Sequence, residues 1–113
     1  MTEALVVLCT CPNSEVAHTL AQTVVNEQLA ACVNVMPGVR SVYRWEGAIC
    51  DDEEVLLIIK TTTDRLDALQ QRVVELHPYD CPEVIALTVS GGSPDYLRWV
   101  TDQTRLGSDA TEP

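Results

Sequence analysis

The sequence predicts an α+β fold, and three observations lead to that prediction. The chain has 113 residues, which is about the length of a single domain. Short apolar and β-branched runs, typical of strands, alternate with two stretches in which apolar residues recur at helical spacing. Their order, β-α-β-β-α-β, is that of a ferredoxin-like sandwich. We expect one such domain with an extra C-terminal helix over residues 1–106, and a flexible tail over residues 107–113.

The N-terminal part of the chain predicts a strand and a helix. Residues 3–10 form an apolar, β-branched run that is too short for a buried helix, so we expect a strand. Asn13 or Ser14 offers an N-cap for the following helix, because a short polar side chain can accept a hydrogen bond from a free backbone N–H group. The apolar face of this helix comprises Val16, Ala17, Leu20, Ala21, Val24, Val25 and Leu29.

The middle of the chain predicts a long hairpin over residues 39–60. Residues 31–44 favour a strand, but Pro37-Gly38 interrupts them and predicts a bulge or kink, since neither residue suits a regular ladder. Glu46-Gly47 marks the turn, and residues 54–61 end the second arm. Because strands usually have ~5–6 residues, we expect this hairpin to project from the core and to pair with a neighbouring subunit.

The remaining residues predict a helix, a strand and a second helix. Thr62 or Thr63 caps a helix over residues 64–77, which ends before Pro78. A strand is expected over residues 83–89. Ser93-Pro94 then begins a short helix that runs to about Gln103.

The first strand is apolar on both faces, which predicts self-association. Alternation places Leu5, Val7 and Cys9 on one face and Ala4, Val6 and Leu8 on the other. In a ferredoxin-like sheet the first and third strands are central and both helices cover the same face. The second face must then be covered by another copy of the chain, because so small a domain has no spare element.

Composition excludes some partners and predicts a compartment. The chain has 17 acidic and 7 basic residues, a net charge of −10, so phosphate backbones and anionic membranes repel it. Its longest apolar runs, residues 4–9 and 55–59, are far shorter than the ~20 residues of a membrane span. No secretory signal is visible, and the five cysteines are an odd number. We therefore expect reduced thiols and a cytoplasmic location.

Five sequence blocks together resemble a known family. They are LAACVNVMPG at 29–38, SVYRWEG at 41–47, VLLIIKT at 55–61, HPYDCPEVIAL at 77–87 and DYLRW at 95–99. In this order and register, over about residues 4–103, they are similar to the CutA family. The resemblance implies a ferredoxin-like fold and a tight homotrimer like that of the PII signalling proteins. It also implies a part in the response to divalent metal ions such as copper, and no established catalytic activity.

The resemblance implies metal ligands at Cys9 and His77. The predicted topology supports their proximity, because the last strand runs antiparallel to the first and begins just after His77. Relatives with copper ligands have two adjacent histidines here, and Leu76 replaces the first, which predicts modest affinity. The family also links Cys32 to metal, but Cys32 is expected at the opposite end of the sheet. The alternative is that Cys9 and Cys11 are buried apolar residues and that His77 binds the last helix carbonyls.

Other polar and aromatic residues leave alternatives open. The acidic run at 51–54 lacks the spacing of a calcium loop, so it is expected to be a solvated hairpin. Tyr43 and Trp45 either stack on a ligand or pack against the next subunit. With Arg44 and Lys60 they could bind a small anion between subunits, as in a PII-like sensor. A hydrolase is the third alternative, but no nucleophile–base motif is present, so no enzymatic activity is expected.

Overall fold

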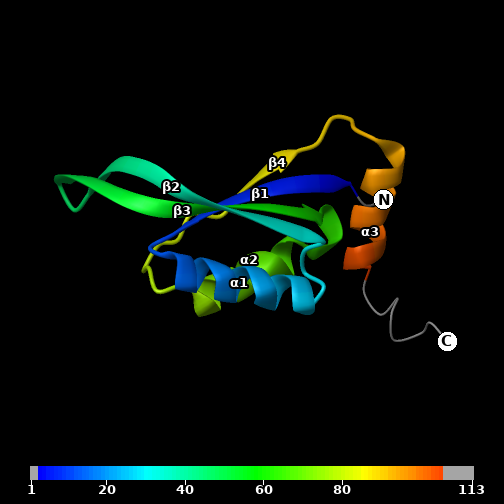
Figure 1. Ribbon diagram of the computed structural model, residues 1–113, viewed down its shortest axis with the longest axis horizontal. Helices are drawn as coiled ribbons and strands as arrows, with labels where there is room; N and C mark the ends of the chain where they lie inside the picture. The colour runs from blue at the N-terminus through cyan, green and yellow to red at the C-terminus, as the bar shows by residue number, and fades with distance from the viewer. Residues whose placement is uncertain (1–2, 106–113) are drawn as a thin grey trace.

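The computed structural model describes residues 3–105 and has the predicted order of elements (Figure 1). These are β1 (Ala4–Cys11), α1 (Ser14–Asn26), β2 (Cys32–Trp45), β3 (Ala48–Thr62), the 3-10 turn η1 (Thr63–Arg65), α2 (Leu66–Leu76), β4 (Ile85–Thr88) and α3 (Pro94–Thr104). The last strand is shorter than predicted, and η1 takes the first turn expected for the second helix. The domain boundary at 106 and the tail over 107–113 lie outside the described residues.

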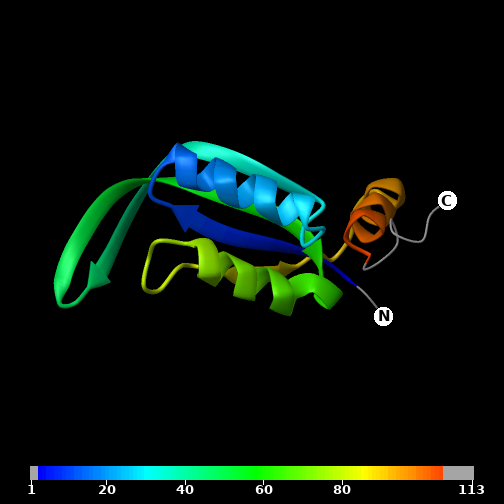
Figure 2. The ribbon, with the colours of Figure 1, turned by 90° about the horizontal axis from the view of Figure 1, so that it is seen from below.

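The four strands form one antiparallel sheet in the order β2-β3-β1-β4. The central strands are therefore β1 and β3, as predicted. Both α1 and α2 cover the same face of this sheet, and α3 lies at the end of the sheet away from the hairpin tip (Figures 1 and 2). The hydroxyl groups of Thr62 at the end of β3 and Thr104 at the end of α3 lie 3.4 Å apart.

The core lies between the sheet and the two helices on its face. Val7 and Leu57 from the sheet pack with Leu20 from α1 and Leu69 from α2, and each is at most 1% exposed. The helix α1 begins where predicted, because the Asn13 side chain accepts a 2.9 Å hydrogen bond from the backbone N–H of Val16.

The β2–β3 hairpin extends well beyond the helices (Figure 1) and gives the chain its length, with extents of 53 × 27 × 22 Å. The register shifts between Met36 and Val39, which confirms the predicted bulge at Pro37-Gly38. The turn is also as predicted. Glu46 and Gly47 both have positive φ, 50° and 82°, and a two-residue hairpin turn with this conformation matches the twist of the flanking strands.

The sheet face turned away from α1 and α2 is apolar. On this face Leu8 of β1 lies opposite Ile58 in β3 and Ile85 in β4. Ile85 and Leu87 are each 50% exposed and Met36 is 48% exposed. Both faces of β1 are therefore apolar, as predicted. No helix among residues 3–105 covers this one (Figure 1). Within the same residues, no helix combines the length and the apolar content that crossing a membrane requires.

Candidate metal centre

Cys9, Cys11 and His77 come together where β1 ends and α2 ends. Cys9 and Cys11 are two residues apart on one strand, so both side chains point to the helix-covered face, and both are fully buried. His77 follows the last residue of α2 and is 7% exposed. The sulfur atoms of the two cysteines and a ring nitrogen of His77 all lie within 4.8 Å of one another. The described residues thus contain a buried cluster with two sulfur donors and one nitrogen donor.

The His77 ring is held by two hydrogen bonds to the backbone. Its Nε2 lies 2.8 Å from the carbonyl oxygen of Thr10 and donates to it, while Nδ1 accepts a 3.1 Å hydrogen bond from the backbone N–H of Tyr79. These two bonds define the tautomer with the proton on Nε2. The ring of Tyr79 packs beside it, with ring centroids 4.6 Å apart. The ring therefore binds the carbonyl group of Thr10 in β1. The alternative, in which His77 binds the last carbonyl groups of the helix, is wrong for the ring.

The interaction between the two thiols separates their acidities. It raises the pKa of Cys9 and lowers the pKa of Cys11, and burial raises the pKa of Cys9 further. The carboxylates of Glu83 and Glu54 act on Cys9 in the same direction. Cys11 is therefore the first of the pair to become a thiolate, which is the form that ligates metals.

The cluster fits a soft metal ion by its donor types and nearly by its size. Thiolate sulfur and imidazole nitrogen suit Cu(I) and Zn²⁺. Donors around a tetrahedral ion, bound at ~2.0–2.3 Å, lie roughly 3.3–3.8 Å apart, so the 4.8 Å cluster must contract by about an ångström. Ligation by His77 also requires one ring nitrogen to give up its backbone hydrogen bond. Burial would shield a bound ion from water.

The proximity of Cys9 and His77 agrees with the sequence prediction, whereas the position of Cys11 in the cluster was missed. The signal was present, because a C-x-C sequence on a strand places both thiols on one face. Cys32 lies outside the cluster as expected, since it pairs with Lys60 while Cys9 pairs with Leu57.

Arg44 and Lys60, which were expected near the hairpin aromatics, lie far apart within one chain, and an anion site between subunits stays a prediction. Arg44 pairs with Ile49 near the turn, whereas Lys60 pairs with Cys32 at the opposite end of the β2–β3 ladder. The Lys60 ammonium group donates a hydrogen bond to the side-chain oxygen of Asn34. A single subunit therefore does not bring the two cations together around an anion.

The acidic run at 51–54 is mostly solvated. Asp51, Asp52 and Glu53 are exposed, and Asp51 forms a 2.7 Å ion pair with Arg40. Glu54 is the exception: it is 5% exposed and its Oε2 accepts a 2.6 Å hydrogen bond from the hydroxyl of Tyr79. The expectation of a solvated hairpin holds for three of these four residues.

The fold and the cluster together define a small α+β protein with a buried thiol–imidazole centre. The family model described as CutA1 divalent ion tolerance protein matches residues 5–103. The chain belongs to the CutA family.

Individual relatives support this assignment across bacteria and plants. The chain is 50% identical over 99 residues to the divalent-cation tolerance protein CutA of Thermus thermophilus, covering 88% of this chain and 96% of the relative. It is 51% identical over 102 residues to the chloroplastic protein CutA of Arabidopsis thaliana, and this match spans 90% of the chain but 56% of that longer relative. The CutA crystal structure from Xylella fastidiosa superposes with a TM-score of 0.89 at 40% identity, covering 91% of this chain and 99% of the other.

Proposed function

We propose that this CutA-family protein contributes to divalent-cation tolerance by binding copper or a similar metal ion at Cys9, Cys11 and His77. The observation that carries the proposal is the convergence of three soft donors within 4.8 Å in a buried cluster. The family description, divalent ion tolerance, agrees with such a role. Two thiols and one imidazole select soft or borderline ions over Mg²⁺ and Ca²⁺, which prefer oxygen ligands.

Cys11 compensates for the histidine that Leu76 replaces. Leu76 is 36% exposed and is not part of the cluster, so residue 76 supplies no ligand. Cys11 instead supplies a third donor from β1, next to Cys9. The resulting donor set is richer in sulfur than one cysteine with two histidines, and this favours Cu(I) and Zn²⁺.

The proposed role is binding, not catalysis. Both ring nitrogens of His77 are hydrogen-bonded to backbone groups of Thr10 and Tyr79, so neither forms the hydrogen bond to a thiol that a nucleophile–base pair has. The thiols of Cys9 and Cys11 are both fully buried and cannot reach a substrate in solvent. A protein that holds an ion without reacting on it is consistent with both facts.

The protein is further proposed to work as a homotrimer in the cytoplasm. The exposed apolar residues Met36, Ile85 and Leu87 on the open sheet face support self-association. The projecting hairpin, with Trp45 46% exposed, offers an arm that can pair with a neighbour. The free thiols of the cluster require a reducing compartment to remain ligands. The relative from Arabidopsis is described as chloroplastic, so compartments differ within the family.

Competition titration against a chromophoric chelator tests the metal site. We expect the parent to bind about one Cu(I) or Zn²⁺ per chain, and Cys9→Ser or Cys11→Ser to bind at least roughly ten-fold more weakly. Cys81→Ser is the matched control, because Cys81 is exposed and outside the cluster. Circular dichroism checks that each variant is folded. A folded Cys9→Ser variant with the parent's affinity would contradict the proposal.

A further inference from the structure

Cys9 and Cys11 are two free thiols that lie side by side on one face of β1. Their sulfur atoms lie within 4.8 Å of each other. The Cα atoms of residues two apart on a strand are about 6.4–6.8 Å apart. This separation is at the upper end of the ~4.4–6.8 Å that a disulfide spans. Rotation of both side chains, with a small backbone adjustment, therefore brings the two sulfur atoms within bonding distance.

The end of β1 is the part of this strand that can make such an adjustment. The strand β4 pairs only with residues 5–8 of β1, so from Cys9 onward β1 is hydrogen-bonded to β3 alone. Cys11 is the last residue of β1, and the next residue is Pro12, which has no backbone N–H group to extend the ladder. The backbone at Cys11 is therefore held on one side and free to twist after it.

The burial of these thiols restricts what can react with them. Cys32 begins β2, Cys50 lies in the hairpin and Cys81 is exposed after α2, and none of these three belongs to the cluster. Cys9 and Cys11 are both 0% exposed, so a bulky oxidant or a thiol of another molecule does not reach them in the folded chain. Hydrogen peroxide is small enough to enter when the strand end opens locally. The nearest thiol partner of each cysteine is then the other one.

We propose that hydrogen peroxide converts Cys9 and Cys11 into a reversible disulfide, and that this disulfide prevents metal binding. In the first step the thiolate of one cysteine attacks a peroxide oxygen, the O–O bond breaks, and a sulfenic acid and a hydroxide ion form. In the second step the other thiol attacks the sulfenic sulfur, the S–S bond forms and water leaves. The two sulfur atoms together lose two electrons, which the peroxide accepts.

The disulfide removes two of the three donors of the metal centre. Thiolates ligate metal ions and disulfide sulfurs do not, so only His77 of the cluster remains as a donor after oxidation. This consequence rests on the proposed metal-binding function, whereas disulfide formation does not. A disulfide that stretches its backbone is easily reduced, and disulfides of cytosolic proteins are usually transient. Oxidation therefore releases the ion, and cellular thiols restore the centre.

Mass spectrometry and zinc titration of the full chain test the proposal. In a variant with Cys32→Ser, Cys50→Ser and Cys81→Ser, only Cys9 and Cys11 remain as thiols. Peroxide treatment of this metal-free variant should remove two hydrogen atoms per chain without forming a covalent dimer. Its zinc affinity should fall at least about ten-fold and return with dithiothreitol. Adding Cys11→Ser gives the matched control, which should gain oxygen and lose no hydrogen.

Two results would overturn the inference. The first is a gain of oxygen on the two cysteines, or no reaction, in place of the loss of two hydrogen atoms. The second is a disulfide that leaves zinc affinity unchanged. The reduced Cys9→Ser variant then separates the two claims: weakened zinc binding there shows that only the switch is wrong, and unchanged binding shows that the proposed metal centre is wrong. Circular dichroism checks folding, and tandem mass spectrometry of the digested, peroxide-treated parent locates the same disulfide without any substitution.

Discussion

The Nε2 atom of His77 donates a 2.8 Å hydrogen bond to the carbonyl oxygen of Thr10, which joins the end of α2 to the end of β1. The same ring accepts a hydrogen bond from the backbone N–H of Tyr79, so it also positions the first residues after α2. His77 thus connects the metal centre with the backbone that follows α2. Metal ligation by His77 must compete with these two bonds.

Replacement of His77 by Ala should destabilise the protein without metal. The change leaves a buried carbonyl and an amide N–H without their partners, which costs about 1–3 kcal/mol per group. Urea unfolding of the metal-free protein measures this. His18→Ala is the control, because His18 is exposed on α1 and its loss should change stability by less than about 0.5 kcal/mol. Equal stabilities of the two variants would show that the hydrogen bonds of the His77 ring do not stabilise the fold.

Replacement of Asn13 by Ala should also destabilise the fold, because it removes the N-cap of α1. Loss of the hydrogen bond from Val16 N–H to the Asn13 side chain should cost about 0.5–2 kcal/mol. Ser14→Ala, one residue further on, should have little effect, since it does not cap the helix. Thermal unfolding of both variants provides the comparison. A larger loss for Ser14→Ala than for Asn13→Ala would mean that the cap is assigned to the wrong residue.

Local signals in the sequence were sufficient to predict most of the fold. Pro37-Gly38 predicted the bulge because neither residue fits a regular ladder, and Glu46-Gly47 was a turn signal at the position where the structure has a two-residue turn. The last strand was predicted too long. Its apolar pattern runs over residues 83–89, but pairing with β1 is limited to Ile85–Thr88. The extent of an edge strand depends on its neighbour, which propensity does not describe.

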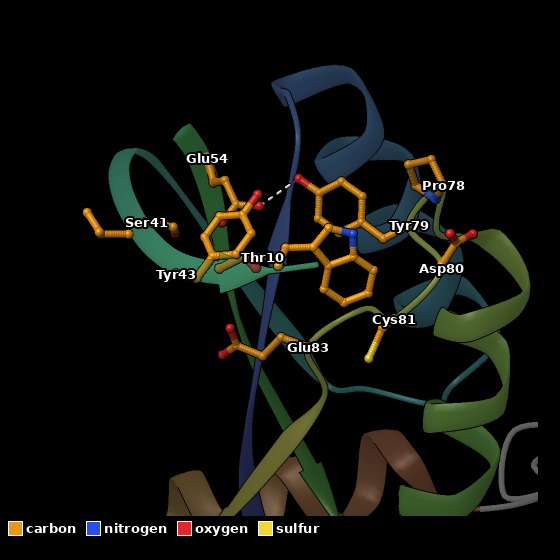
Figure 3. A pocket seen from close by; sticks show the side chains of 11 residues that line it. Thr10, Ser41, Tyr43, Glu54, Pro78, Tyr79, Asp80, Cys81 and Glu83 are labelled. Atoms are coloured by element: carbon orange, nitrogen blue, oxygen red, sulfur yellow. Dashed lines mark hydrogen bonds between the residues drawn. The ribbon is translucent and has the colours of Figure 1, made fainter. Parts of the chain in front are cut away.

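The candidate sites were predictable only in part. The antiparallel direction of the first and last strands predicted that Cys9 and His77 lie close together. The C-x-C spacing also indicates that Cys11 lies on the same face as Cys9, and this was not used. The two backbone hydrogen bonds of His77 had no sequence signal, because they depend on how residues 77–79 turn after α2. The sequence also did not predict the cavity of about 650 Å³ between the outer hairpin and the segment after α2 (Figure 3). This cavity forms from segments that are far apart along the chain, which no local pattern encodes.

Replacement of Trp45 by Ala should weaken the proposed trimer. Trp45 lies next to the hairpin turn and is 46% exposed in the single chain, which is unusual for so large an apolar side chain. If it is an anchor against a neighbouring subunit, its loss should reduce the free energy of association by about 2 kcal/mol or more. Sedimentation velocity over a dilution series measures this, and Trp45→Phe should retain more of the association. Unchanged sedimentation of Trp45→Ala would remove Trp45 from the interface.

The hydrogen bond between Tyr43 and Asp52 should be visible in the pH titration of the phenol. Acceptance by the Asp52 carboxylate is the main cause that raises the pKa of Tyr43 to about 12. The phenol has a pKa of 10.0 in the unfolded chain, and its raised pKa in the folded chain stabilises the fold below pH 10. This contribution is lost as the pH rises through about 12. Asp52→Asn should lower the pKa toward 10, as measured by NMR of the tyrosine rings. Asp51→Asn, which breaks the pair with Arg40 instead, should leave it unchanged.

The ligand set of the metal centre can be read directly by X-ray absorption spectroscopy of the zinc-loaded protein. Zinc is the probe because its bond lengths to sulfur and nitrogen differ clearly, at ~2.3 Å and ~2.0–2.1 Å. If Cys9, Cys11 and His77 hold the ion, the spectrum should contain two sulfur ligands and at least one imidazole nitrogen. Cys11→Ser should remove one sulfur, and Cys81→Ser should remove none. A first shell with only nitrogen and oxygen would contradict the account, because the ion would then lie outside the buried cluster.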